Sequence, residues 1–283
     1  MTNLVLSRTP SPLPPTYLLP SEPSLGPQQL LDWVAIPDLA SHDVRDIEER
    51  WRIRVPDNEQ AQAEQLIQAQ QFQQWLVSPR SSQLLVHGNY DSNRLISGLS
   101  LFCISFAQAL DERNPQFLTL KFFCGLHEDA SWDSHTGGRA IVQSFICQLL
   151  CQYDFSAAQL PPVNQESVRN GDIEHLCWVF KDLIRLLPNS LVVVCIIDGI
   201  LYYERPSFLK EMGMVLISIM QMSQQTSGAA LKLLITSPTG TTETRQPFSD
   251  GQILSMDAMV QPGLVASRSR LERELFEGFE SSK

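Results

Sequence analysis

The chain has 283 residues, of which 43% are hydrophobic and 18% charged, and its formal net charge is −10. This size suffices for one large α/β domain, or two small ones, with a sizeable core. The acidic charge repels polyphosphate backbones and disfavours a nucleic-acid partner. No apolar run reaches the roughly 20 residues that span a bilayer, and no charged segment leads into an apolar one at the N-terminus. We therefore expect neither membrane insertion nor a secretory signal.

The cysteines lie mostly inside apolar segments, which indicates buried free thiols in a reducing compartment and a cytoplasmic protein. Cys124 and His127 form a C-x-x-H pair, with His135 further along the chain. A zinc site usually needs four well-spaced ligands, so we predict no metal site. The six cysteines are Cys103, Cys124, Cys147, Cys151, Cys177 and Cys195.

Residues 1–27 contain seven prolines and no periodic apolar face, which predicts a disordered or extended arm. Pro12 and Pro15 form a PxxP motif that could enter an SH3-like groove, although a plain linker explains them as well. Residues 28–80 are expected to form a helical lead-in segment, with short helices and irregular chain from Gln28 to Val55. The apolar spacing in Glu59–Leu76 predicts one helix.

From residue 81 to 260, apolar strands alternate with amphipathic helices. This alternation predicts a mostly parallel five-stranded sheet with helices on both faces, hence a three-layer α/β fold. The expected strands are Gln83–His87, Phe117–Cys124, Leu191–Ile197, Leu231–Thr236 and Ile253–Met256. The expected helices are Leu95–Leu110, Arg139–Tyr153, Ile173–Leu187 and Phe208–Gln224.

Residues 261–283 are predicted to form a C-terminal tail helix. Its apolar positions recur at helical spacing within Arg268–Lys283. Such a helix could dock on the body of the protein or on a partner.

Ligands of parallel α/β sheets bind beyond the carboxyl ends of the strands. That edge should carry the pairs His87–Gly88, Asp198–Gly199 and Thr236–Ser237. Gly88 directly follows a buried strand, as does the first glycine of the phosphate loop G-x-x-x-x-G-K-[ST]. In this frame Asn93, Arg94 and Leu95 stand in the places of the second glycine, the lysine and the hydroxyl residue.

The segment from Phe72 to Met256 resembles the STAND group of P-loop NTPases, which includes the NACHT and nephrocystin-type fungal proteins. Four blocks carry the resemblance, in the order in which the group has them. They are FQQWLVSPRSSQLLVHG, FFCGLHEDASWDSHTGGRAIVQSFICQLL, LVVVCIIDG and LKLLITSP. The resemblance implies a P-loop NTPase-like fold. It also implies a vestigial nucleotide site at Gly88, Asn93, Arg94, Asp198, Gly199, Thr236 and Ser237.

The departures from the group's pattern bear on function. Arg94 would replace the lysine that reaches the phosphates, and Leu95 would replace the hydroxyl that binds Mg²⁺. Asn93 replaces a glycine that lets the backbone wrap round phosphate. Asp198 matches the Walker B aspartate, but the acidic residue that usually follows it is missing. Pro238 replaces the arginine of the T-S-R motif. We therefore expect no catalytic residues and no cofactor beyond weak ATP or GTP binding.

Two readings remain open for single residues. Asp198 could instead cap the turn that follows its strand, and Arg94 could be a solvent-exposed residue in the first turn of a helix.

The favoured hypothesis is a non-hydrolysing P-loop NTPase-like domain that acts as a protein-interaction or scaffold module, or persists as the remnant of a STAND switch. Its partner would be an unidentified protein. The alternative is a slow or atypical NTPase that uses Arg94 for phosphate and Glu204 as base. A nucleotide bound as a static structural ligand is a third possibility.

Overall fold

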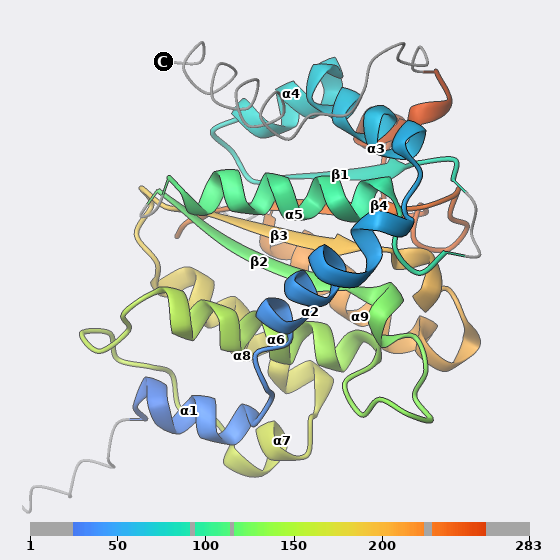
Figure 1. Ribbon diagram of the computed structural model, residues 1–283. Coiled ribbons are helices and arrows are strands. Elements are labelled where there is room, and N and C mark those ends of the chain that lie inside the picture. The colour runs from blue at the N-terminus through green and yellow to red at the C-terminus, as the bar shows by residue number, and fades with distance from the viewer. Residues whose placement is uncertain (1–24, 91–93, 114–115, 224–227, 259–283) are drawn as a thin grey trace, which may run out of the picture.

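A five-stranded parallel sheet forms the centre of the protein. The computed structural model describes residues 25–258 apart from 91–93, 114–115 and 224–227. The strands lie in the order β2-β3-β4-β1-β5, and every pairing is parallel. The predicted α/β fold is therefore confirmed (Figure 1). The strands are β1 (Ser82–His87), β2 (Phe117–Phe123), β3 (Val192–Asp198), β4 (Ala230–Ser237) and β5 (Ile253–Ser255).

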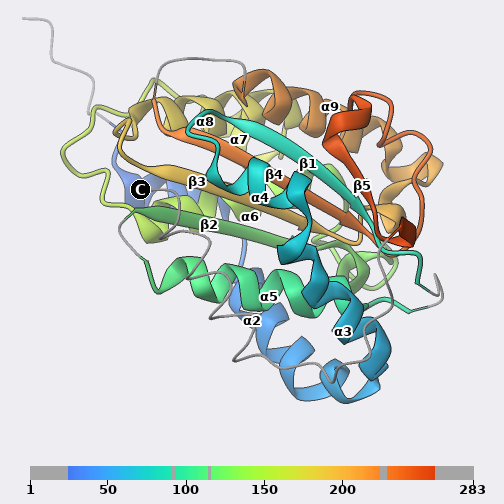
Figure 2. The ribbon, with the colours of Figure 1, turned by 90° about the horizontal axis from the view of Figure 1, so that it is seen from above.

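Helices cover both faces of the sheet and make three layers, as Figures 1 and 2 show. Successive strand residues point to opposite faces: Leu84 belongs to the core on one face and Leu85 to the core on the other. One face carries α3 (Asp57–Glu64), α4 (Gln70–Val77) and α5 (Gly98–Asp111). The other carries α6 (Gly137–Gln152), α8 (Ile173–Leu186) and α9 (Pro206–Ser223), with α1 (Pro27–Val34) and α7 (Gln165–Arg169) outside them.

The lead-in segment differs from the sequence prediction in one place. After α2 (Leu39–Asp46), short helical turns run to Arg54, as expected. The single helix predicted for Glu59–Leu76 is wrong, because the chain is extended at Ala69 (ψ 124°) between α3 and α4. The break lets Phe72 pack its ring against Phe106 of α5, with the ring centroids 5.5 Å apart.

A buried lysine fastens the lead-in segment to the sheet. Lys232 of β4 is 2% exposed. Its Nζ donates to the carbonyl oxygens of Trp75 (2.7 Å) and Ser78 (2.5 Å) and to Oγ of Ser82 (3.0 Å). Burial lowers the pKa of Lys232 to about 8. The cation lies at the carboxyl end of α4, where the helix dipole favours positive charge.

Two glutamine side chains close the free edge of the sheet at β2. Oε1 of Gln148 accepts from the backbone N–H of Lys121 at 2.9 Å, and its Nε2 donates to the carbonyl of Lys121 at 2.9 Å. Gln152 makes the same pair of bonds with Thr119, at 3.2 and 2.8 Å. These side chains of α6 therefore bond with β2 as a sixth strand would. An unpaired edge is otherwise a template for aggregation.

The ends of the chain lie largely beyond the described part. The predicted Pro-rich arm, residues 1–27, is outside it except for its last three residues, and α1 begins at Pro27. The predicted tail helix, residues 261–283, is wholly outside it. Within the described ranges, no helix combines the length and apolar character needed to cross a bilayer.

Candidate functional site

The carboxyl ends of β1, β3 and β4 meet at one edge of the sheet. Gly88, just after β1, donates its N–H to the carbonyl of Ser237 at 2.9 Å. Tyr90 donates its N–H to the carbonyl of Pro238 at 2.6 Å, so the pairing with β4 continues past the strand end. This is the edge where the sequence places the candidate residues.

Asp198, the last residue of β3, is the buried carboxylate of this edge, with 1% exposure. Its Oδ1 accepts from the hydroxyl of Thr236 at 2.5 Å, and its Oδ2 accepts from the hydroxyl of Ser100 at 2.6 Å. Burial raises the pKa of Asp198 to about 6, while the two hydroxyl bonds oppose that rise. Gly199 follows in the left-handed region (φ +71°), which favours glycine. The carboxylate thus joins β3 to β4 and α5.

Ser100 was not among the residues predicted from sequence. The helix expected from Leu95 begins at Gly98, because Ser97 caps it and its N–H donates to Oγ of Ser100 at 3.0 Å. Ser97 and Ser100 have the spacing of a capping box before an apolar run, and that signal could have revealed this start. Gly98-Leu99-Ser100 also has the spacing of G-K-[ST], with leucine in the place of lysine.

The contacts of Arg94 are with residues other than Asp198. Its guanidinium is 3.2 Å from Oε1 of Glu59 in α3, and its carbonyl accepts from the hydroxyl of Tyr202. Asn93, the other residue predicted in this loop, lies outside the described residues.

Side chains fill the space beside Gly88. Tyr90 is 7% exposed, and its hydroxyl donates to the carbonyl of Glu59 at 3.2 Å. A Cβ atom on Gly88 would lie 2.7 Å from the Tyr90 ring and 3.0 Å from Leu99. A Cβ atom on Gly125 would lie 2.0 Å from the carbonyl oxygen of Leu95. Gly88, Tyr90 and Leu95, described residues of the loop after β1, are therefore packed against their neighbours.

These residues fit a magnesium nucleotide poorly. Ser100 and Asp198 are the kind of hydroxyl and carboxylate that hold Mg²⁺ in P-loop sites, but both carboxylate oxygens already accept hydrogen bonds. Arg94, the residue expected in the place of the lysine, pairs its guanidinium with Glu59, and Leu99, just before Ser100, is fully buried. The cation that triphosphate binding needs is not supplied by these positions.

The opposite face of the same edge carries a second set of polar groups. Ser237 is fully buried, and its Oγ has no hydrogen-bond partner in the described part of the chain. Nε2 of His87 is 3.0 Å from the hydroxyl of Thr241. Glu204, the candidate base, accepts from the N–H groups of Thr242 and Thr244 at 2.9 and 2.6 Å. Its carboxylate therefore orders the loop after β4.

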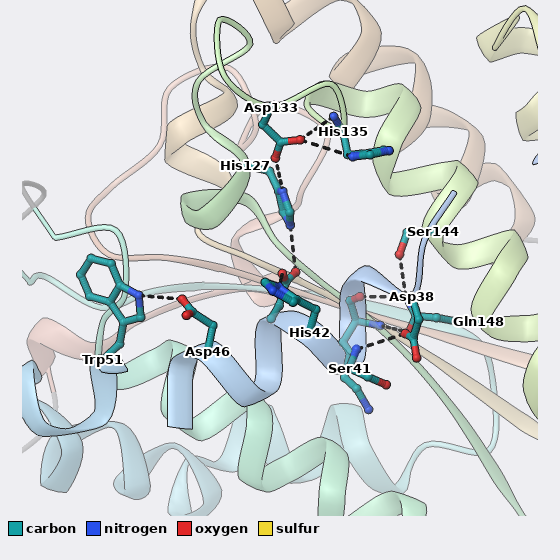
Figure 3. A network of polar contacts seen from close by, with 12 residues as sticks. Asp38, Ser41, His42, Asp46, Trp51, His127, Asp133, His135, Ser144 and Gln148 are labelled. Atoms are coloured by element: carbon teal, nitrogen blue, oxygen red, sulfur yellow. Dashed lines mark hydrogen bonds and ion pairs between the residues drawn. The ribbon is translucent and has the colours of Figure 1, made fainter. Parts of the chain in front are cut away.

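An Asp–His–Asp cluster, in which Asp43 and His127 are buried and Asp133 is half-buried, lies near the same end of the sheet, on the α2 side (Figure 3). Nε2 of His127 is 2.9 Å from Asp43 of α2, and its Nδ1 is 2.5 Å from Asp133. Burial alone lowers the pKa of His127, but hydrogen bonds and charge from Asp43 and Asp133 outweigh burial and raise it. The imidazolium joins α2 to the loop before α6. We call Asp43, His127 and Asp133 the histidine clasp.

In the C-x-x-H pair, His127 contacts carboxylates and Cys124 is a buried thiol. The ring of His127 faces two carboxylates, and burial raises the pKa of the Cys124 thiol well above its usual value. In the parts of the chain that the structure describes, no three His, Cys, Asp or Glu side chains are grouped so that they could hold a metal ion.

Comparison with known proteins identifies the family of this domain. The family model described as nephrocystin 3, N-terminal, matches residues 62–237, which is more than half of the chain. This range includes β1 to β4 and the residues Gly88, Ser100, Asp198 and Thr236. A search of curated proteins finds no match. The chain belongs to the nephrocystin 3 N-terminal family.

Proposed function

We propose that this domain is a P-loop NTPase-like scaffold that has lost hydrolysis and acts as a protein-interaction module, as the remnant of a STAND switch. The observation that carries the proposal is the set of bonds at Asp198. Both of its oxygens accept from protein hydroxyls, at 2.5 and 2.6 Å, in a site with 1% exposure. These bonds engage the buried carboxylate as a link between β3, β4 and α5.

The losses at the phosphate side support the same proposal. Arg94, in the place of the lysine, pairs with Glu59, Leu95 cannot replace a magnesium-binding hydroxyl, and Pro238 replaces a sensor arginine. Each missing charge-assisted contact is worth roughly 1.5–3 kcal/mol. Together they weaken nucleotide binding by several orders of magnitude. Without an acid to orient water, most of the hydrolytic rate disappears as well.

The proposal also includes a cytoplasmic location and a protein partner. All six cysteines are free thiols, a state that a reducing compartment maintains.

Thermal melting tests the proposal directly. A ligand that binds the native state raises stability by about 2.7 kcal/mol at one hundred times its dissociation constant. We expect no change in melting temperature with millimolar Mg-ATP, Mg-GTP or Mg-ADP, and no heat in calorimetric titration. A melting temperature that climbs with nucleotide concentration would overturn the proposal.

One observation favours a second candidate function, slow or regulatory nucleotide binding. Ser100 meets Asp198 at 2.6 Å, as a magnesium-binding hydroxyl would in a P-loop site. If this candidate holds, Ser100→Ala abolishes a nucleotide-dependent shift in melting temperature. Ser105→Ala, a buried serine further along α5, leaves that shift intact.

A further inference from the structure

Two thiols lie side by side on the outer part of α6. Cys147 and Cys151 are four residues apart, so they share one face of the helix with Cβ atoms about 5–6 Å apart. Cys147 is half-buried and Cys151 is exposed, whereas the other four cysteines are buried. The pair therefore differs from the core thiols in being open to reagents.

Both thiols line one cavity. A space of about 200 Å³ lies between α6 and the start of α2, and its lining includes Cys147, Cys151, Asp38, Ser144 and Lys121. Figure 3 shows Asp38 at the start of α2 beside Ser144 and Gln148 of α6. A small ion can reach the thiols through this space.

The spacing of the two thiols favours a bridging metal ion over a disulfide. A disulfide needs Cβ atoms roughly 3.5–4.5 Å apart, closer than helical i,i+4 positions allow without distortion. A single bridging ion suits the wider spacing. Zn²⁺ needs about four ligands. Asp38 lines the same cavity, but among the described residues no three His, Cys, Asp or Glu side chains are grouped closely enough to hold a metal ion. Soft thiolates instead select Cu(I).

We propose that Cys147 and Cys151 form a two-thiolate site on α6 for a soft monovalent cation of the Cu(I) class. Binding forms two metal–sulfur bonds and releases two thiol protons, with no change in oxidation state. The product carries one net negative charge. Two charged residues line the same cavity, Asp38 and Lys121, and the ammonium of Lys121 is 3.2 Å from Asp111. The site is separate from Asp198 and does not depend on whether nucleotide binds.

The protonation of the thiols makes the affinity dependent on pH. Burial, the neighbouring Cys151 and the negative charge of Asp38 across the cavity raise the pKa of Cys147 to about 11. A cation must displace that proton, so affinity increases with pH. The dependence approaches a hundredfold per pH unit while both thiols remain protonated in the free protein, since two protons are released.

Competition with a chromogenic chelator tests the site. The full-length protein is titrated anaerobically into the Cu(I)–bicinchoninate complex, and loss of the chelator's absorbance reports the transfer. We expect one Cu(I) per chain for the wild type. Cys147→Ser and Cys151→Ser should each abolish the transfer, whereas Cys177→Ser, which removes a buried thiol of α8, should leave it unchanged.

Several outcomes overturn the proposal. One is a wild-type chain that takes no Cu(I) from the chelator. Another is transfer that survives in either single variant, since two thiolates are then not required. A third is the ready formation of a Cys147–Cys151 disulfide by mild oxidants, since the thiols then lie closer than argued. Circular dichroism of each serine variant separates loss of the site from loss of the fold.

Discussion

The hydroxyl of Ser100 donates to Oδ2 of Asp198 at 2.6 Å and thereby joins the first turn of α5 to the end of β3. With Thr236 on the other oxygen, the carboxylate holds three elements together at one edge of the sheet. The carboxylate of Asp198 therefore has a structural role. Its substitution therefore has consequences for stability that can be measured.

Replacement of Asp198 by asparagine should preserve or increase stability at pH 7. The pKa of the native carboxyl is raised to about 6 from 3.8, so the folded state holds its proton more tightly than the unfolded state between these values. Wild-type stability should fall as pH rises from 4 to 6, by up to about 3 kcal/mol, and Asp198→Asn should lack that fall. Urea unfolding at pH 4, 5, 6 and 7 measures this, with Asp32→Asn, at an exposed position of α1, as control. A loss of more than about 1 kcal/mol at pH 7, the typical effect of a point mutation, would contradict the prediction.

The histidine clasp should contribute stability that depends on pH. His127→Ala leaves Asp43, with a side chain 2% exposed, without its buried partner and should cost about 3–5 kcal/mol. Because the native pKa of His127 is raised, its contribution is complete below about pH 6.5 and is lost as pH rises through the native value. The difference in free energy of unfolding between wild type and variant, measured with urea, should therefore be larger at pH 6 than at pH 9. His42→Ala, at an exposed histidine 3.8 Å from Asp43, should change stability little. A gap that widens with pH would count against the clasp.

The glutamines on the β2 edge should protect the protein from aggregation. The double variant Gln148→Ala, Gln152→Ala removes four hydrogen bonds to Thr119 and Lys121. At about 1 kcal/mol each, unfolding free energy should fall by about 2–4 kcal/mol. The freed strand edge should also promote assembly, seen as light scattering on mild heating. Gln143→Ala on the same helix serves as control, and equal scattering from both variants would refute the role.

Replacement of Lys232 by methionine should loosen the lead-in segment. The variant removes the donor from the carbonyls of Trp75 and Ser78 and should destabilise the protein by roughly 2 kcal/mol at pH 7. Burial lowers the native pKa of Lys232 to about 8, so wild type should gain stability over the variant as pH rises from 8 to 10.5. Chemical denaturation across that range, with the exposed Lys210→Met as control, checks both statements. Unchanged stability at pH 7 would exclude the fastening role.

The strands were predictable because each is a short, uniformly apolar run, and a sheet buried on both faces requires that pattern. Asp198 and Thr236 could be placed at one edge for the same reason. The start of α5 was placed three residues early, because Leu95 and Ile96 continue the apolar run while Ser97 sets the cap. Ser100 was missed along with that start.

Contacts between residues far apart in the chain could not be predicted from the sequence. Asp43, His127 and Asp133 are ordinary polar residues in their local patterns, and only the packing of α2 on the body makes them a cluster. The break at Ala69 likewise depends on the packing of α4 against α5. The pairing of Gln148 with β2 leaves no local signal, because glutamine on a helix is usually solvated.

The contact between α2 and the body also bears on where the folding unit begins. The matched family segment covers residues 62–237, yet Asp43 lies before it and β5, which pairs with β1, lies after it. A fragment trimmed to the matched boundaries would expose one edge of β1 and leave His127 without Asp43. The packed body is therefore wider than the segment that the family model matches, and expression of this domain calls for boundaries drawn from the structure.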